Sequence, residues 1–385
     1  MTSPVNPLTA IPNAWQPLAS RSCDLLREHR APGGAWPASP HFAPYRYSWF
    51  RDGSFIAEGA SAAGLLDEAD RFHAWCRDVL ERERPAVDAV LAALAAGAQP
   101  DDAEYLPARY RLDGTRQVDD WWNFQVDGYG TWLWALERHL FRAHRSDVVP
   151  YGEPYAGPYA GPYAAGIETA VRYLTATGTG TCRDWWEENR DETHVTTLAG
   201  VAAGLRAAVR MGTLPPPLAA RAAEVAERCA SLIRTEGVRD GHLVKWLGGT
   251  EVDASLLAVA AVYDVLRLDD PLVTATVTAI EARLVDGGVH RYEADTFYGG
   301  GQWPVLAALL AWHHSRAGNV ERAAALLDWA GRTADADLLL PEQVAPLLAP
   351  AVLDEWVDRW GPSAHPLLWS HGMFLAAVAA FLEPR

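Results

Sequence analysis

The sequence DWWEE (184–188), near the middle of the chain, places two adjacent glutamates behind two tryptophans. Hydrolysis of a glycosidic bond uses such carboxyl groups: a protonated one donates to the leaving oxygen, and an ionised partner completes the reaction. Burial against the indoles and repulsion from Glu188 both favour the protonated form of Glu187, which is therefore a candidate general acid. The alternative interpretation is a solvated helix start, with Asn189 as the cap and Glu192 three residues later.

A candidate ionised partner lies far downstream, in LPEQ (340–343). Glu342 follows a proline and has no acidic sequence neighbour, so we expect it to stay ionised and to act as a base on water. Two carboxylates from distant loops are the arrangement that glycoside hydrolysis requires.

Charged residues flanked by aromatics recur on segments that precede apolar helical patterns. Arg51 and Asp52 lie in YRYSWFRDG (45–53), and Arg291 lies in RYEAD (291–295). A single aspartate at such a position can simply cap a helix. Several such clusters on successive loops of a helical ring, however, are expected to converge at one end of the ring.

Other catalytic signatures are missing: the chain has no HExxH, P-loop or GxSxG motif, so nucleotide chemistry and serine hydrolysis are unsupported. The pair Asp119-Asp120 could chelate magnesium around a diphosphate, but no second metal motif accompanies it. Such pairs are usually solvated turns. We therefore expect neither a metal nor a cofactor.

Composition narrows the class of ligand. Hydrophobic residues make up 49% of the 385 residues and charged residues 21%, as in an ordinary globular protein. A formal net charge of -16 argues against nucleic acid and anionic membranes as partners, because both need basic surfaces. The 17 tryptophans suit small sugars, which have an apolar face and a polar rim, although tryptophan can also fill helix junctions.

The expected location is the cytoplasm. The N-terminal segment lacks a basic start followed by an apolar core, and no window reaches the ~18 apolar residues that span a bilayer. The four cysteines are far apart and form no CxxC pair, so we expect reduced thiols. The sequence does not predict the oligomeric state.

Helical periodicity dominates the chain, and many of its segments are rich in alanine, which lets helices approach closely. The clearest helical patterns are 55–66, 132–141, 195–209, 218–233, 254–266, 303–318 and 367–382. Short polar turns separate them, so we predict serial helical hairpins in one all-α domain over 1–385. Prolines predict an extended or turn-rich inserted loop at 148–166, which is either exposed to solvent or a flap that contacts substrate. Glycines predict a short hairpin or a long loop at 238–252.

Seven short blocks together resemble glycoside hydrolase family 15, the glucoamylase-like enzymes, in the same order and over about residues 40–380. The blocks are Tyr47–Asp52, Gln125–Gly130, Trp186–Glu188, Asp253–Leu257, Arg291–Tyr292 with Asp295–Phe297, Pro341–Gln343 and Trp369–His371. The resemblance implies an (α/α)6 barrel with the site at the narrow end of a funnel. It also implies inverting hydrolysis, which places the two carboxyl groups ~6.5–9.5 Å apart.

The resemblance also implies individual roles: Glu187 as general acid, Glu342 as general base, and Arg51 with Asp52 as the grip on the terminal glucose. The implied substrate-binding residues are Tyr47, Trp49, Arg51, Asp52, Trp121, Gln125, Trp186, Glu188, Arg291 and Trp369. The expected partner is a small glucose-containing oligosaccharide. None of these roles needs a metal.

Two departures bear on specificity. The family's usual Asn-Pro-Trp is replaced by GGGQWP (299–304), and we find neither an N-terminal β-sandwich nor a starch-binding module. This architecture resembles single-domain bacterial isomaltose glucohydrolases, which favours short α-1,6-linked substrates. An α-1,4 or trehalose hydrolase of the same family remains an alternative, as does a non-catalytic sugar-binding barrel.

Overall fold

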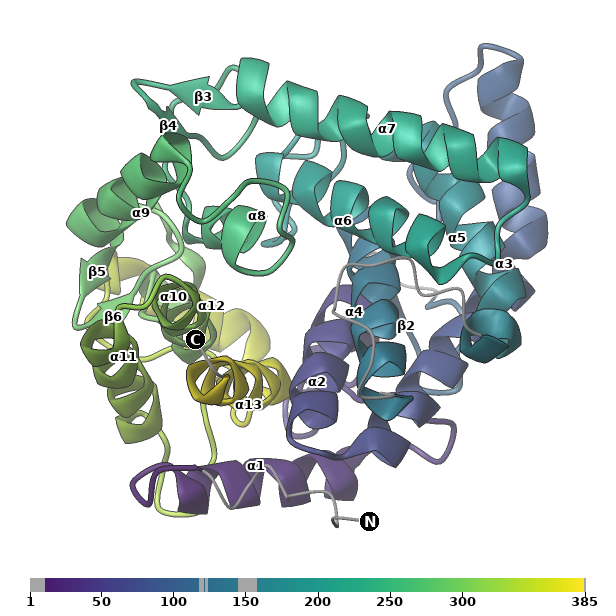
Figure 1. The fold of residues 1–385 in the computed structure, drawn as a ribbon. Helices are drawn as coiled ribbons and strands as arrows, with labels where there is room; N and C mark the ends of the chain where they lie inside the picture. The colour runs from purple at the N-terminus through teal and green to yellow at the C-terminus, as the bar shows by residue number, and fades with distance from the viewer. Residues whose placement is uncertain (1–10, 118–120, 122–123, 145–157, 384–385) are drawn as a thin grey trace.

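The computed structural model describes residues 11–117, 121, 124–144 and 158–383. Within them, two concentric rings of helices surround one axis (Figure 1). The inner ring consists of α2 (Phe50–Ala62), α4 (Asp127–Ala143), α6 (Val195–Met211), α8 (Ala258–Ala261), α10 (Pro304–Arg316) and α13 (Leu368–Leu382). The outer ring consists of α1 (Gln16–His29), α3 (Leu66–Ala95), α5 (Ala164–Thr177), α7 (Pro216–Thr235), α9 (Pro271–Leu284) and α11 (Val320–Arg332).

The inner ring is closed. Each inner helix contacts the next, and α13 packs against α2 to complete the circle. The inner helices are buried nearly all round, α2, α8 and α10 most completely, whereas outer helices such as α7 and α11 bury one face. This alternation of buried and amphipathic helices is an (α/α)6 barrel, so the predicted fold class is confirmed.

Glycines allow the inner helices to touch. A Cβ atom on Gly130 of α4 would lie 2.4 Å from the carbonyl oxygen of Gly200 on α6. Likewise, a Cβ atom on Gly59 of α2 would lie 2.0 Å from the carbonyl oxygen of Gly372 on α13. Because no side chain fits at these crossings, glycine here permits the close packing that the alanine-rich sequence predicts.

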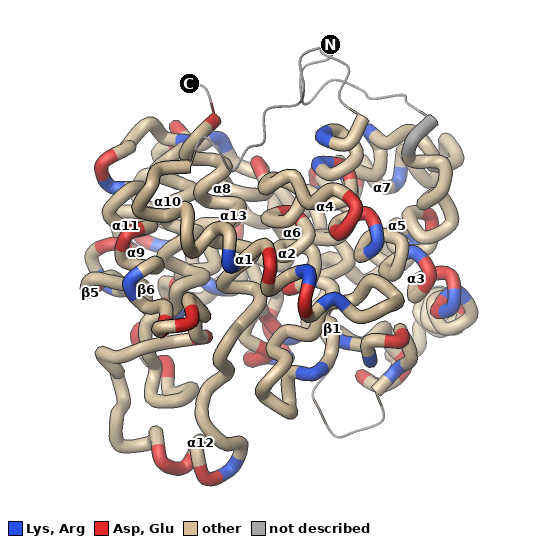
Figure 2. The backbone as a smooth tube through the Cα atoms, turned by 90° about the horizontal axis from the view of Figure 1, so that it is seen from below, with Lys and Arg blue, Asp and Glu red and all other residues tan. Residues whose placement is uncertain are grey.

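Short elements occupy the ends of the barrel. Three antiparallel two-stranded ribbons pair β1 (Ser48–Trp49) with β2 (Arg109–Tyr110), β3 (Val238–Arg239) with β4 (His242–Leu243), and β5 (Val285–Asp286) with β6 (Gly288–Val289). The 3-10 turns are η2 (Ala43–Tyr45), η3 (Pro158–Tyr163), η4 (Ala254–Leu257), η5 (Phe297–Gly299) and η6 (Pro350–Val352). A further short helix, α12 (Leu353–Trp360), projects from one end of the barrel (Figure 2).

One local prediction is wrong, one is wrong at its last three residues, and one is confirmed. The 254–266 pattern forms only η4 and the four-residue α8, because α8 ends at Ala261 and the chain turns to a φ of 51° at Asp264. Within 148–166, residues 158–163 form the 3-10 turn η3, but the loop was predicted to extend too far, because α5 already begins at Ala164. Residues 148–157 lie outside the described residues. The hairpin predicted within 238–252 is present as β3 and β4.

In the part of the chain that the structure describes, no helix combines the length and the apolarity needed to cross a membrane.

Candidate active site

A cavity lies at the end of the barrel where the inner helices begin. Arg51 and Asp52 belong to the first turn of α2, Trp369 belongs to the first turn of α13, and residues 184–188 lie on the loop before α6. The convergence of helix-start loops that the sequence predicts is therefore present. The cavity is lined by Ala38, Phe42, Pro44, Tyr45, Trp49, Arg51, Asp52, Trp121, Trp185, Trp186, Glu187, Glu188, Arg291, Phe297, Tyr298, Trp303, Glu342, Trp356, Trp360, Leu367 and Trp369.

Glu187 is held in the cavity by two indoles. Trp49 Nε1 donates to Glu187 Oε1 at 2.6 Å, and Trp121 Nε1 donates to Glu187 Oε2 at 2.7 Å. Both carboxylate oxygens are therefore oriented, and the two indoles stabilise negative charge on them. A general acid that becomes a carboxylate as it gives up its proton benefits from this arrangement.

The backbone around Glu187 is a tight turn rather than a helix start. Glu187 has a φ of 67°, which is uncommon for a residue with a side chain. Asp184 stabilises the turn, because its Oδ1 accepts from the backbone N–H groups of Trp186 at 2.9 Å and of Glu188 at 2.8 Å. The helix-start alternative is thereby excluded, since α6 begins only at Val195.

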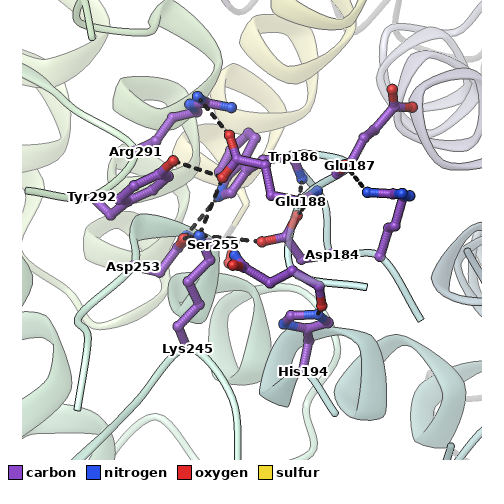
Figure 3. A network of polar contacts seen from close by, with 12 residues as sticks. Asp184, Trp186, Glu187, Glu188, His194, Lys245, Asp253, Ser255, Arg291 and Tyr292 are labelled. Atoms are coloured by element: carbon purple, nitrogen blue, oxygen red, sulfur yellow. Dashed lines mark hydrogen bonds and ion pairs between the residues drawn. The ribbon is translucent and has the colours of Figure 1, made fainter. Parts of the chain in front are cut away.

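The left-handed turn separates the two neighbouring glutamates. Figure 3 shows their carboxylates pointing in different directions. Glu188 Oε1 accepts from Arg291 Nη2 at 3.3 Å, and Glu188 Oε2 accepts from the hydroxyl of Tyr292 at 2.6 Å. Burial raises the pKa of Glu188 above its ordinary value, while Arg291 and Lys245 oppose that rise. Two adjacent acids in the sequence thus face different surroundings.

Glu342 is almost fully buried, and its carboxyl group takes up a proton at a higher pH than the local sequence predicts. Burial raises its pKa from 4.5 to about 7, against the opposing effects of hydrogen bonds from the hydroxyls of Tyr45 and Ser363. The expectation that Glu342 stays ionised because it lacks acidic neighbours therefore needs correction: its exposure is only 1%. A carboxyl group that titrates near neutral pH is well suited to take up a proton from water.

Arg51 and Asp52 form a buried polar wall of the cavity. Arg51 Nη1 donates to Gln125 Oε1 at 2.7 Å and approaches Asp127 Oδ2 at 3.3 Å, while its Nε lies 3.4 Å from Asp52 Oδ2. Burial raises the pKa of Asp52 to about 6, although Arg51 opposes this. Within the described residues, Arg51 Nε and Asp52 Oδ2 make no hydrogen bond, although the two atoms face each other as an ion pair.

Comparison with known proteins identifies the family. The sequence profile of glycosyl hydrolases family 15 matches residues 19–332. The chain belongs to glycosyl hydrolases family 15. Isomaltose glucohydrolase from Kribbella flavida is 46% identical over 93% of this chain and 91% of its own length. Glu342 lies beyond the matched segment, so its place in the site rests on the geometry described above.

Solved structures agree with this assignment. A glycosidase variant in complex with glucose is 43% identical, covers 98% of this chain and 99% of its own, and superposes with a TM-score of 0.90. A bacterial glucoamylase complexed with acarbose is 17% identical, with a TM-score of 0.74 over 97% of this chain and 57% of its own. The second likeness supports the barrel fold alone.

Ten of the twelve residues expected in this family 15 site line the cavity, and Tyr47 and Gln125 do not. Gln125 lies behind Arg51 and accepts its hydrogen bond. Tyr47 packs on one side of the Arg109 guanidinium, whose Cζ is 4.2 Å from the centroids of both the Tyr47 and the Trp121 rings. Both residues therefore contact other side chains of the site and do not line the cavity themselves. The order of residues along the chain does not show which side chains reach the cavity, so the sequence could not distinguish them.

The structure adds residues that the sequence did not single out. Tyr45 hydrogen-bonds Glu342, and its ring packs edge-on against Trp49 and Trp121, which hold Glu187. Its position in the aromatic stretch before Arg51 was the available signal. Trp356 and Trp360 of α12 also line the cavity, and the Trp360 ring packs edge-on against Trp121.

In the described ranges, no three His, Cys, Asp or Glu side chains are grouped so that they could hold a metal ion. The pair Asp119-Asp120 lies outside these ranges.

Proposed function

We propose that this family 15 enzyme is an inverting, exo-acting α-glucoside hydrolase that releases β-D-glucose from the non-reducing end of short α-glucosides. One observation carries the proposal: Glu187 and Glu342 reach one aromatic cavity from two separate loops. Each has its own hydrogen-bond donors, so the two carboxyl groups can take different roles in one displacement.

In this mechanism, Glu187 gives its proton to the glycosidic oxygen as the bond between that oxygen and the anomeric carbon breaks. The indoles of Trp49 and Trp121 stabilise the carboxylate that this transfer leaves on Glu187. Glu342 takes a proton from a water molecule, whose oxygen bonds to the anomeric carbon from the opposite face. The configuration changes from α to β in one displacement.

The base needs to be ionised before it can act. Because burial raises the pKa of Glu342 to about 7, the fraction of free enzyme in which Glu342 is ionised grows as the pH rises through 7. Tyr45 supports the ionised form, since its hydroxyl donates to Glu342. Activity is therefore proposed to fall on the acidic side of neutrality.

The two ends of the substrate meet different walls. Arg51 and Asp52, in the first turn of α2, are proposed to bind hydroxyls of the terminal glucose, which makes attack exo-acting. Glu188 and Arg291 are proposed to contact the leaving sugar. Trp121, Trp186 and Trp369 offer indole faces and edges to the two rings.

We further propose isomaltose and other short α-1,6-linked glucosides as substrates. The support is the extensive likeness to the isomaltose glucohydrolase of Kribbella flavida. Initial rates of glucose release from isomaltose, maltose and trehalose test this directly. We expect kcat/KM for isomaltose to exceed the other two by at least about tenfold, a difference of ~1.4 kcal/mol in the transition state. Faster hydrolysis of maltose or trehalose would overturn the linkage assignment and leave the reaction class intact.

The proposed setting is the cytoplasm. All four cysteines, Cys23, Cys76, Cys182 and Cys229, are free and buried. Unpaired thiols are typical of a reducing compartment.

A further inference from the structure

Lys245 stands out in the composition. It is the only lysine among the 33 lysine and arginine residues of the chain. It follows β4 on the loop after the hairpin, and its side chain is only 3% exposed. A buried cation carries a large desolvation cost, so its position needs compensating partners.

Three carboxylates provide that compensation. The Nζ atom of Lys245 lies 3.2 Å from Asp184 Oδ2, 3.4 Å from Asp253 Oδ2 and 3.6 Å from Glu188 Oε2 (Figure 3). It also lies 3.7 Å from the centroid of the Tyr292 ring. Burial alone would lower the pKa of Lys245, but Asp253, Asp184 and Glu188 raise it above its ordinary value. The ammonium group therefore stays charged.

Arg291, which also lies beside Glu188, does not make the ion pairs that Lys245 makes. Arg291 donates through Nε and Nη2 to both oxygens of Asp295, and only its Nη2 reaches Glu188. Asp184 and Asp253 make their ion pairs with Lys245. A compact ammonium can approach three carboxylates from one point, whereas the planar guanidinium of arginine suits one or two. This explains why the one lysine of an arginine-rich chain occurs here.

Each partner of Lys245 acts on the same part of the site. Asp184 binds the backbone N–H groups of Trp186 and Glu188, which fixes the turn around Glu187. Asp253 Oδ2 accepts from the Trp186 indole at 2.8 Å. The third partner is the Glu188 carboxylate itself. Lys245 thus joins the turn that carries the acid to the loop before η4.

We infer that Lys245 is a positioning residue for the leaving-group side of the site. It holds the 184–188 turn so that Glu187 meets the glycosidic oxygen and Glu188 meets the leaving sugar. The inference rests on the proposed function, because it assigns Lys245 to one half of that reaction. It does not place Lys245 in contact with substrate.

Two substrates separate the leaving-group side from the rest of the site. Isomaltose needs a proton on its leaving oxygen and a site for its second sugar, whereas α-D-glucosyl fluoride has no leaving sugar and depends far less on the acid. For Lys245→Met we expect kcat/KM for isomaltose to fall about 100-fold, as misplacement of reacting groups does. For the fluoride we expect a change of less than about threefold.

The contrary outcomes are distinct. Equal losses on both substrates would show that Lys245 supports the whole domain, and unchanged hydrolysis of isomaltose would show that it positions nothing. If wild-type enzyme released glucose from neither substrate, the proposed function itself would fail. Arg138→Met is the matched control: it removes a cation paired with buried Glu58 on α2, away from the cavity lining, and should leave the ratio of the two rates unchanged.

A spectroscopic measurement avoids dependence on a folded Lys245→Met variant. Lysine labelled with ¹³C at Cε gives one side-chain NMR signal in this protein, because the chain has one lysine. Glu188→Gln should shift that signal, since it removes a charge 3.6 Å from Nζ, whereas Glu342→Gln should leave it unchanged. A signal that does not respond to Glu188→Gln would overturn the inference.

Discussion

Glu342→Gln is expected to hydrolyse isomaltose with a kcat about 10,000-fold below that of the wild type, at the upper end of what general acid–base catalysis contributes. Glutamine fills nearly the same volume but cannot take a proton from water. The loss should be equally severe with α-D-glucosyl fluoride, since water attacks the anomeric carbon in both reactions. Stopped-time glucose assays at pH 7 measure both losses.

The same variant should gain stability relative to the wild type as the pH rises through 7, which separates lost chemistry from lost folding. The folded pKa of Glu342, about 7, lies above its ordinary value of 4.5, so the native state retains a proton that the unfolded chain releases. Its contribution to stability is fully present below pH 4.5 and disappears as the pH rises to about 7. Glutamine does not titrate. Between pH 4.5 and pH 8, the free energy of unfolding of the variant should therefore increase relative to that of the wild type by on the order of 3 kcal/mol.

Urea unfolding at pH 4.5 and pH 8 measures this difference. If both proteins responded identically to pH, the burial assigned to Glu342 would be contradicted. If the variant retained more than about a tenth of wild-type turnover, Glu342 would not be the base.

Glu187→Gln is expected to separate the two substrates. With isomaltose, kcat should fall about 1,000-fold or more, because the glutamine cannot protonate the leaving oxygen. With α-D-glucosyl fluoride the fall should be less than about tenfold, since fluoride departs with little help from an acid. The amide also cannot accept from both indoles, because only its oxygen is an acceptor, so Trp49 or Trp121 loses a partner.

Comparison of kcat on isomaltose and on the fluoride decides this assignment. Glu188→Gln is a suitable companion, because it changes the adjacent carboxylate and leaves the proposed proton donor intact. If Glu188→Gln lost as much activity with isomaltose as Glu187→Gln did, the roles of the two neighbours would need to be exchanged.

The barrel and the loops that form the site were predictable from the sequence. Arg51, Asp52 and Trp369 occur just where apolar helices begin, and in a ring of helical hairpins such positions come together at one end. Ordered blocks across most of the chain carried the rest of that prediction, including the pairing of Glu187 with Glu342 in one cavity. The convergence of the helix-start loops and the pairing of Glu187 with Glu342 both follow from the order of segments along the chain, which is visible in the sequence.

Direction and burial were not predictable in the same way. The carboxylates of Glu187 and Glu188 point in different directions because Glu187 has a φ of 67°. This backbone conformation is strained for a residue with a side chain and is held by the surrounding turn. The raised pKa of Glu342 arises from burial among residues remote in sequence. Lys245 lies 57 residues after Glu188 and joins it through space alone. Only its uniqueness as a lysine was visible beforehand.

The central claim is single displacement with inversion, performed by Glu187 and Glu342. Proton NMR of the first product, recorded within seconds to minutes of adding enzyme to isomaltose, observes the anomeric proton before mutarotation mixes the forms. The account predicts that the β-anomer of glucose appears first, with the α-anomer growing in only as mutarotation proceeds. Initial release of α-glucose would contradict it.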